Sequence, residues 1–341
     1  MFLLRDAMLD DLDGLHAVAA HLNSVNLPND RTVLGRIIQH SLESFSGTID
    51  PFEREFLFVL EDVEQKRIIG TSMIHAQHGT RRSPHIFFDV LEDERYSETR
   101  DIHKSHRLLR IGYHYVGPTE IGGLVLLPEY RRHAVALGKW LSYVRFLYIA
   151  MHRGDFRDEV ISELLPPLEP DGTSLVWEAI GRHFTGMSYQ EADRLSQTNK
   201  EFIRSLFPQD PICLSLFPKA VQDVIGQVGP QTKGVEAMLR RIGFHYAERI
   251  DPFDGGPHFI ARTDDITLVR ESIRATVKDA TSGADEGRPF GLVAVERMRA
   301  PYFQATGGRF RIDGRSLIHL PPDVRSLLSV EPGEAVGVVP I

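Results

Sequence analysis

The stretch that most constrains this chain is residues 120–151, because it contains a strand pattern, a basic turn and a helix pattern in direct succession. Residues 124–127 are an apolar run short enough for a buried strand. Pro128 ends that run, since proline has no N–H to donate to a neighbouring strand. Beyond the turn, apolar side chains recur at helical spacing and predict a buried helix over residues 134–151.

The turn between this strand and this helix is basic, with Arg131, Arg132 and His133 in a row. The first turn of a helix presents unpaired N–H groups and the positive end of the helix dipole, and both attract anions. The pattern therefore favours a phosphate-binding turn. An ordinary strand-to-helix connection with solvated arginines accounts for the same residues.

Composition limits the class of protein and its partners. The chain of 341 residues carries 39 lysines and arginines against 47 aspartates and glutamates, which argues against a nucleic-acid partner. Cys213 is the only cysteine, so no intramolecular disulfide forms and a reducing compartment fits. The first residues turn acidic without a long apolar core, which is unlike a signal peptide. Lys139 and Arg145 make the most apolar helix a poor membrane span. We expect a cytoplasmic protein without a membrane partner.

Domain boundaries are suggested by a small, polar segment at residues 279–288, which reads as a linker. It separates a body, residues 1–278, from a mostly β module, residues 289–341. Two helix–glycine–aromatic steps, at residues 177–184 and 238–244, suggest that the body has two related halves, about 1–150 and 151–278; coincidence is the alternative, since glycine commonly ends helices. Other expected strands are residues 2–5, 56–60, 68–74, 85–91, 106–111, 160–164 and 244–250.

Residues 220–257, which contain the stretches GQVGPQT and FDGGP, closely resemble the arginine N-succinyltransferase family. Weaker similarity covers nearly the whole chain, including the pattern from Glu120 to Arg131. The resemblance implies an α/β (α+β) fold of the acyl-CoA N-acyltransferase (GNAT-like) class, in which the basic turn holds the CoA pyrophosphate. It also implies arginine catabolism by transfer of a succinyl group from succinyl-CoA to the α-amino group of L-arginine. Succinyl-CoA, or another acyl-CoA, would be a co-substrate and no cofactor would be tightly bound. The expected assembly is a homo-oligomer or a pair with a paralogous chain.

The same resemblance assigns roles to residues of the acyl-donor site. Leu124 matches the family's succinyl-CoA contact and would act through its main chain. The expected coenzyme-binding residues are Leu124, Leu126, Arg131, Arg132 and Gly138. The turn over residues 131–138 is longer than the family pattern and poorer in glycine, which affects how closely the backbone approaches the pyrophosphate.

The family's proton-donating histidine falls where this chain has Gly229, which has no side chain to titrate. His245 and His258 flank the same region and are candidate substitutes, although a solvated or structurally bonded histidine is the simpler interpretation of each. A general acid or base typically contributes about two to four orders of magnitude in rate, so its loss need not abolish turnover. Slow or rewired succinyl transfer, transfer to another amine, and a non-catalytic paralogue or subunit all remain open.

Recognition of the substrates requires charges of both signs. A guanidinium is best held by carboxylates, and the candidates at strand ends and in the loop are Glu120, Glu163, Asp251 and Asp254. Asp254 is also simply favourable turn chemistry. The succinyl carboxylate needs a cation, for which Arg131 and Arg182 are candidates. No metal is expected, because the groups His75, His78 and His85, and His103 and His106, lack the close ligand spacing of a zinc site.

Overall fold

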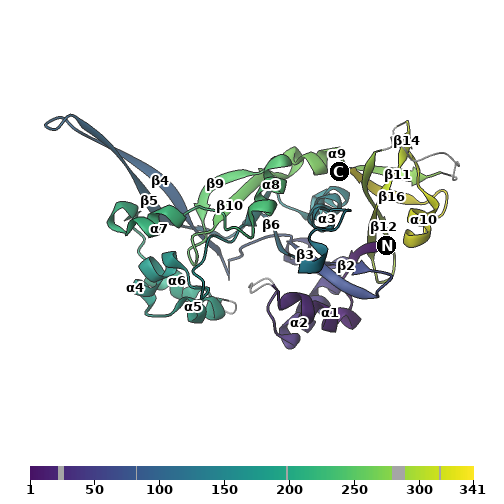
Figure 1. Cartoon of the computed structure of the whole chain (residues 1–341), viewed down its shortest axis with the longest axis horizontal. Coiled ribbons are helices and arrows are strands. Elements are labelled where there is room, and N and C mark those ends of the chain that lie inside the picture. Colours follow the sequence, from purple (N-terminus) through teal and green to yellow (C-terminus); the bar gives the residue numbers. More distant parts are fainter. Residues whose placement is uncertain (22–26, 82, 197–198, 279–288, 315) are drawn as a thin grey trace. The chain divides into compact units, whose positions relative to one another are not determined.

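The computed structural model describes residues 1–21, 27–81, 83–196, 199–278, 289–314 and 316–341. The chain forms two compact units, each assembled from separate segments. Unit 1 comprises residues 1–76, 119–158 and 262–341, and unit 2 comprises residues 77–118 and 159–261 (Figure 1). This division differs from the halves and the C-terminal module expected from the sequence. The expected linker, residues 279–288, lies outside the described residues.

Unit 1 is built on a sheet that joins the two ends of the chain. The strand order is β14-β15-β11-β16-β12-β13-β1-β2-β3-β6. The N-terminal strand β1 (Phe2–Asp6) pairs antiparallel with both β2 (Glu55–Asp62) and β13 (Phe303–Arg309). The C-terminal strands therefore extend the N-terminal sheet. The other strands are β3 (Arg67–His75), β6 (Thr119–Leu126), β11 (Ile273–Val277), β12 (Phe290–Glu296), β14 (Arg311–Asp313), β15 (Leu317–His319) and β16 (Ala335–Pro340).

The central helix of unit 1, α3 (Leu137–Met151), packs on strands from both ends of the chain. Glycines make this approach close: a Cβ atom at Gly307 would lie 1.9 Å from the Trp140 ring, and one at Gly70 would lie 2.8 Å from the side chain of Leu141. The remaining helices are α1 (Leu12–Ala19), α2 (Arg31–Phe45), α9 (Thr267–Glu271) and α10 (Pro322–Leu328). Asp30 caps α2, accepting hydrogen bonds from the N–H groups of Thr32 and Val33.

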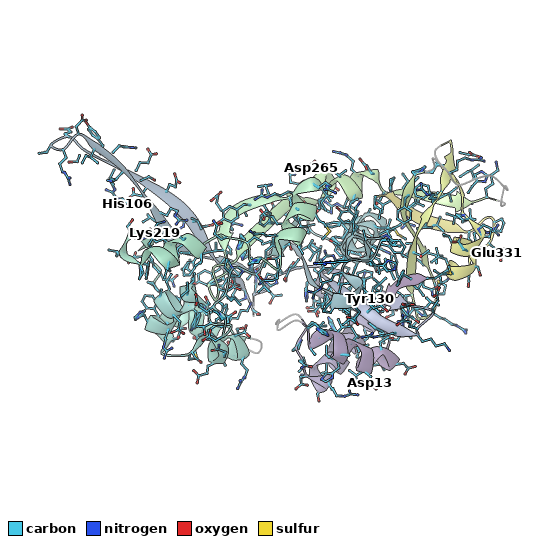
Figure 2. The ribbon with its side chains drawn as sticks, in the orientation of Figure 1. Asp13, His106, Tyr130, Lys219, Asp265 and Glu331 are labelled. Atoms are coloured by element: carbon cyan, nitrogen blue, oxygen red, sulfur yellow. The ribbon has the colours of Figure 1, made fainter. Side chains whose placement is uncertain are left out.

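Unit 2 contains the strands β7-β10-β9-β4-β5-β8, in that order. Its strands β4 (His85–Ser97) and β5 (Ile102–His114) form one continuous hairpin, longer than the two short strands expected, and its far end extends past the rest of unit 2 (Figure 1). Figure 2 labels His106 on this hairpin, where Nδ1 lies 2.8 Å from Ser215 Oγ. The other strands are β7 (Glu159–Glu163), β8 (Ile212–Cys213), β9 (His245–Ile250) and β10 (Pro257–Arg262).

The helices of unit 2 enclose an aromatic core. Trp177 is fully buried, stacks on Phe253 with ring centroids 5.2 Å apart, and donates its indole N–H to the Met187 carbonyl at 3.0 Å. This contact anchors the FDGGP loop to the core. The helices are the π-helix Trp177–Gly181, α4 (Arg182–Thr185), α5 (Tyr189–Ser196), α6 (Glu201–Leu206), α7 (Lys219–Val224) and α8 (Lys233–Arg241).

Short 3-10 turns complete both units, at Leu9–Asp11, Pro51–Glu53, Pro128–Tyr130, Arg153–Asp155, Leu214–Leu216 and Thr263–Asp265. Tyr130, labelled in Figure 2, donates its hydroxyl to Asp62 Oδ2 at 3.1 Å and so ties the end of one such turn to β2. In the part of the chain that the structure describes, no helix has both the length and the apolar character needed to cross a bilayer.

Candidate active site

The strand, basic turn and helix expected from the sequence are present in unit 1. Strand β6 ends at Leu126, a 3-10 turn follows, and α3 begins at Leu137, three residues later than the expected start. Ala136, immediately before the helix, has a left-handed backbone with φ of 53°. No side chain of the described residues caps this helix start, so its first N–H groups remain available to an anion.

Strand β6 carries a β-bulge where the sequence placed the thioester contact. Thr71 pairs with Val125 and Met73 pairs with Gly122, so Gly123 and Leu124 together face a single residue of β3. Gly123 has φ of 57° and its carbonyl accepts the Thr71 hydroxyl at 2.8 Å. A bulge leaves one residue outside the strand ladder. The half-buried Leu124 therefore lies at a point where the main-chain N–H and C=O groups are not all paired with the neighbouring strand.

The basic residues of the turn are exposed. Arg131 donates Nε to the Leu126 carbonyl at 2.9 Å, which ties the turn to the end of β6. Arg132 makes no ion pair within the described ranges. Gly138 has room for a Cβ atom, whose nearest neighbour would be Leu126 at 3.8 Å, so the fold itself does not require glycine there.

Sequence reasoning missed the charge at the centre of α3. Arg145 is only 2% exposed, and burial lowers its pKa to about 9. Its guanidinium donates to the Ser142 carbonyl and hydroxyl, each at 2.9 Å, and to the Gly122 carbonyl on β6 at 3.3 Å. No carboxylate of the described residues forms an ion pair with it. An unpaired buried cation is costly and is frequently functional.

Glu120 is buried in unit 1 within a row of polar side chains. Register pairs it with His75, which in turn pairs with Glu55 on the next strand. His75 Nδ1 lies 3.3 Å from Glu55 Oε1. Burial alone would raise the pKa of Glu55, but His75 and His40 outweigh it and the pKa is lowered. Glu120 thus belongs to a mixed histidine–carboxylate row of the sheet.

In unit 2, three imidazoles surround the carboxylate of Glu163 at the end of β7. Its Oε1 lies 2.9 Å from Nε2 of His85, 3.5 Å from Nε2 of His258 and 3.9 Å from Nε2 of His78. The His85 side chain is 2% exposed and that of His258 is fully buried. Their rings stack with centroids 5.3 Å apart. The sequence singled out Glu163 and His258 for separate roles, and the fold brings them together.

Charge states within this cluster follow from burial and proximity. Burial opposes ionisation of Glu163, but the surrounding histidines, His258 and His85 foremost, outweigh it and hold its pKa well below the usual range. Burial, together with the neighbouring His78, lowers the pKa of His85 to about 3. At neutral pH, Glu163 is therefore a carboxylate and His85 is a neutral imidazole.

The two family stretches converge beside Glu163. The Gly229 N–H donates to the Leu165 carbonyl at 2.8 Å, and the Thr232 hydroxyl donates to the same carbonyl at 2.9 Å. The Gly226 N–H donates to the Gly255 carbonyl at 3.0 Å, which joins GQVGPQT to FDGGP. A Cβ atom at Gly229 would lie 2.6 Å from the Pro166 carbonyl oxygen, so the backbone leaves no room for a side chain there.

Asp251 and Asp254 add two further carboxylates to this part of unit 2. Asp251 Oδ1 accepts the N–H groups of Phe253 and Asp254, at 2.6 and 3.3 Å, and Asp254 Oδ1 accepts that of Gly256 at 2.7 Å. Burial, with Glu163 nearby, raises the pKa of Asp251 to about 7. Burial and Asp251 raise the pKa of Asp254 well above normal. Neither forms an ion pair with a lysine or arginine of the described residues.

Two candidates lie apart from this cluster. His245, at the start of β9, is exposed and pairs through its backbone with Ile260. Arg182 is also exposed and forms a surface ion pair with Glu178 at 2.8 Å, four residues earlier on the chain. Of the two candidate histidines, only His258 therefore lies in the Glu163 cluster. Arg182 is an ordinary surface arginine.

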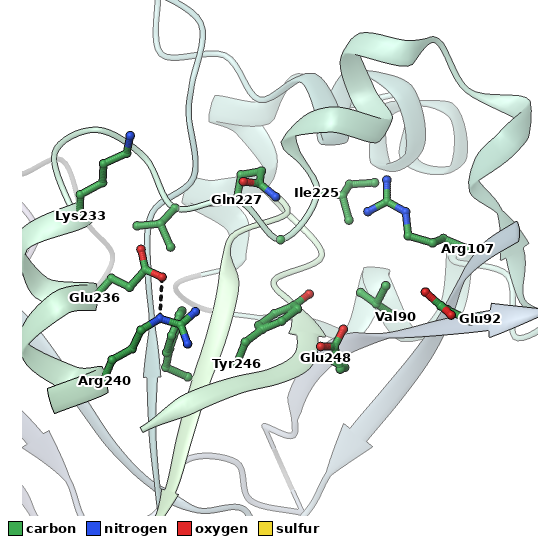
Figure 3. A pocket seen from close by; sticks show the side chains of 13 residues that line it. Val90, Glu92, Arg107, Ile225, Gln227, Lys233, Glu236, Arg240, Tyr246 and Glu248 are labelled. Carbon is green, nitrogen blue, oxygen red and sulfur yellow. Dashed lines mark hydrogen bonds and ion pairs between the residues drawn. The ribbon is translucent and has the colours of Figure 1, made fainter. Parts of the chain in front are cut away.

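Unit 2 also contains a polar pocket of ≈ 390 Å³ (Figure 3). Ile225 and residues 226–228, the start of GQVGPQT, form one side, and Lys233, Glu236 and Arg240 of α8 form another. Figure 3 shows the Glu236–Arg240 ion pair, whose atoms are 2.8 Å apart. None of the predicted site residues lines this pocket, so it does not coincide with the Glu163 cluster.

Comparison with known proteins agrees with the sequence resemblance. The profile of the family described as arginine N-succinyltransferase beta subunit matches residues 2–268. An arginine N-succinyltransferase of Yersinia pestis (strain Pestoides F) is 35% identical over 318 residues, covering 92% of this chain and 90% of its own. One from Photorhabdus laumondii is 34% identical over 293 residues, covering 85% and 84%.

A solved structure shows the same fold over the full length. The arginine/ornithine succinyltransferase subunit AI from Pseudomonas aeruginosa matches with a TM-score of 0.84 and 27% identity, covering 100% of this chain and 98% of that one. This match confirms the α/β fold class predicted from the sequence. With the family profile spanning most of its length, the chain belongs to the arginine N-succinyltransferase family.

Proposed function

We propose that this protein transfers the succinyl group of succinyl-CoA to the α-amino group of L-arginine, in arginine catabolism. The observation that carries the proposal is the group of half-buried carboxylates, Glu163, Asp251 and Asp254, built around the family's FDGGP stretch. Carboxylates partly withdrawn from water without a lysine or arginine partner are poised for a cationic ligand. A guanidinium supplies planar donors that match a carboxylate, which favours arginine over a neutral amine.

The acyl-donor side of the proposal rests on unit 1. The uncapped start of α3, with Arg131 and Arg132 before it, suits the coenzyme diphosphate, and Leu126 and Gly138 border that turn. The bulge at Leu124 leaves main-chain groups for the thioester carbonyl. For the free carboxylate of the succinyl group we assign Arg145, because it is a buried guanidinium without an anionic partner within the described ranges.

The reaction needs no covalent enzyme intermediate. The neutral amine attacks the thioester carbon, a tetrahedral oxyanion forms, and its collapse breaks the carbon–sulfur bond and releases the CoA thiolate. The amine must first lose a proton, and Gly229 cannot accept one. We assign this role to His258, because it is buried beside Glu163 whereas His245 is exposed. A carboxylate beside an imidazole stabilises the protonated ring.

Thiol release from succinyl-CoA, followed with a thiol-reactive dye across a panel of amino acids, tests the proposal. We expect release to depend on arginine and to be lower with lysine, with ornithine and with uncharged amino acids. Release no faster than the uncatalysed rate with any amine would instead support a non-catalytic subunit. An equal rate with every amine would contradict the arginine assignment.

We also infer that the active form is an oligomer in the cytoplasm, either of identical chains or with a paralogous chain. The inference is supported by the words "beta subunit" in the description of the matching family and "subunit AI" in that of the solved relative. Light scattering after size-exclusion chromatography measures the mass. A mass equal to that of one chain, 38.5 kDa, in an active preparation would contradict it.

A further inference from the structure

The histidines around Glu163 pose a problem that the proposed reaction does not solve. His85 is buried, and neither of its ring nitrogens makes a hydrogen bond of acceptable geometry with any described residue, although Nε2 is 2.9 Å from the Glu163 carboxylate. A buried polar group left without a hydrogen bond is unfavourable, so its persistence calls for a missing partner. One acid–base group suffices for succinyl transfer, whereas this cluster contains three imidazoles.

The donor atoms of the cluster are arranged as the ligands of one ion would be. Those of His78, His85 and Glu163 all lie within 4.8 Å of one another. In a tetrahedral zinc site with bonds of about 2.0–2.1 Å, two ligand atoms are roughly 3.3 Å apart. Glu163 Oε1 lies 2.9 Å from His85 Nε2, which is shorter than that separation, and 3.9 Å from His78 Nε2, which is longer. Small side-chain rotations would equalise the two distances.

The donor set favours a transition metal. Two imidazoles and one carboxylate form a common zinc ligand set, whereas Mg²⁺ and Ca²⁺ prefer oxygen ligands. Glu163, Asp251 and His258 form a second group of neighbouring donors, but Asp251 Oδ1 already accepts two backbone N–H groups. The two-imidazole group is therefore the better site, with His258, 3.5 Å from the same carboxylate oxygen, beside it.

We propose that His78, His85 and Glu163 of unit 2 bind a divalent transition-metal ion of the zinc class. The sequence spacing did not suggest it, because the strands and loops of unit 2 bring together donors from positions 78, 85 and 163. Such an ion would give His85 the partner it lacks and neutralise part of the carboxylate charge. The proposal does not depend on succinyl transfer, since it concerns binding alone.

Calorimetric titration of the EDTA-treated, dialysed full chain with zinc chloride tests the site, without substrate or coenzyme. We expect one zinc ion per chain and no binding of Mg²⁺. Co²⁺ should give the visible absorption typical of tetrahedral coordination. Zinc should also raise the melting temperature, because an ion that binds only the folded state stabilises it by mass action.

His85→Phe and Glu163→Gln should each weaken zinc binding at least tenfold. The matched control is His114→Phe, which alters a ring 5.6 Å from His85 but removes no donor of either group, and it should bind zinc as the parent does. Melting curves without metal establish whether each variant folds. If His85→Phe does not fold, zinc binding by Glu163→Gln alone tests the proposal. Absence of stoichiometric zinc binding by the parent chain, or equal binding by Glu163→Gln, would overturn the proposal.

Discussion

Units 1 and 2 contain ionisable side chains of opposite sign: an arginine is buried in unit 1, and three carboxyl groups are half-buried in unit 2. In unit 1, the Arg145 guanidinium lies under β6 without a carboxylate partner among the described residues. In unit 2, Glu163, Asp251 and Asp254 are gathered without a lysine or arginine partner in the same ranges. A cationic group in one unit and carboxylates in the other suit an enzyme whose acyl donor ends in a carboxylate and whose acceptor ends in a cation.

The largest effect is expected from removing the buried cation. Arg145→Met should lower kcat/KM for succinyl-CoA by roughly 30- to 5000-fold, because truncating one partner of a buried charge pair costs about 2–5 kcal/mol. Acetyl-CoA has no terminal carboxylate. The rate with acetyl-CoA, which is expected to be small, should therefore fall far less than the rate with succinyl-CoA. Initial rates with both donors measure the difference. Arg145→Lys, which keeps the charge, should recover part of the succinyl-CoA rate; equal losses with both donors would assign Arg145 a structural role.

On the acceptor side, Asp254→Asn should lower kcat/KM for arginine by about 10- to 100-fold, since a hydrogen bond to a charged group contributes about 1.5–3 kcal/mol. The amide oxygen can still accept the Gly256 N–H, which preserves the turn. Rates with arginine and with an uncharged amino acid should converge in the variant. Asp210→Asn, an exposed change in unit 2, is the control. An equal fall in kcat/KM with every amine would show that Asp254 only maintains the structure of its loop.

Backbone packing leaves no room for a side chain at Gly229, the position that the sequence resemblance assigned to the family's histidine. Gly229→Ala should destabilise the protein by roughly 1–3 kcal/mol, because its Cβ atom would meet the carbonyl oxygens of Pro166 and Leu165 at 2.6 and 2.9 Å. Gly229→His should be at least as destabilised and should not gain activity. Gly234→Ala, in α8 with open space around it, is the matched control and should stabilise by about 0.5–1 kcal/mol. Denaturant midpoints measure both; a stable, more active Gly229→His would contradict this account.

Sequence reasoning identified the parts of the site that depend on short-range patterns. The strand, turn and helix of residues 120–151 and the GQVGPQT and FDGGP stretches were found because each is local. The bulge at Leu124 could not be predicted from the strand sequence alone, because it depends on how β6 aligns with β3. The His85–Glu163 contact joins residues far apart in the chain, and Arg145 looked like an incidental charge in an apolar helix. The same long-range pairing, β1 with β13, explains why the expected C-terminal module is part of unit 1.

The smallest effect concerns the pH dependence of stability in unit 2. The pKa of Asp251 rises from 3.8 to about 7 on folding, so the folded chain holds a proton that the unfolded chain has lost between these values. This group therefore stabilises the fold at low pH, and that contribution is lost as pH rises through 7. Asp251→Asn keeps the acceptor for Phe253 and carries no charge, so at pH 8 its free energy of unfolding should exceed that of the parent by roughly 1–2 kcal/mol and it should melt at a higher temperature.

That advantage should shrink as pH falls toward 5, where the parent Asp251 is protonated. Melting temperatures of parent and variant at several pH values measure it, and Asp210→Asn, whose side chain is exposed, should show no such trend. Addition of arginine tests whether Asp251 belongs to the cation site. A bound guanidinium would favour the charged carboxylate and stabilise the parent more than the variant. If arginine raised both melting temperatures equally, Asp251 would not contribute to the cation site, and Glu163 and Asp254 would have to supply its charge.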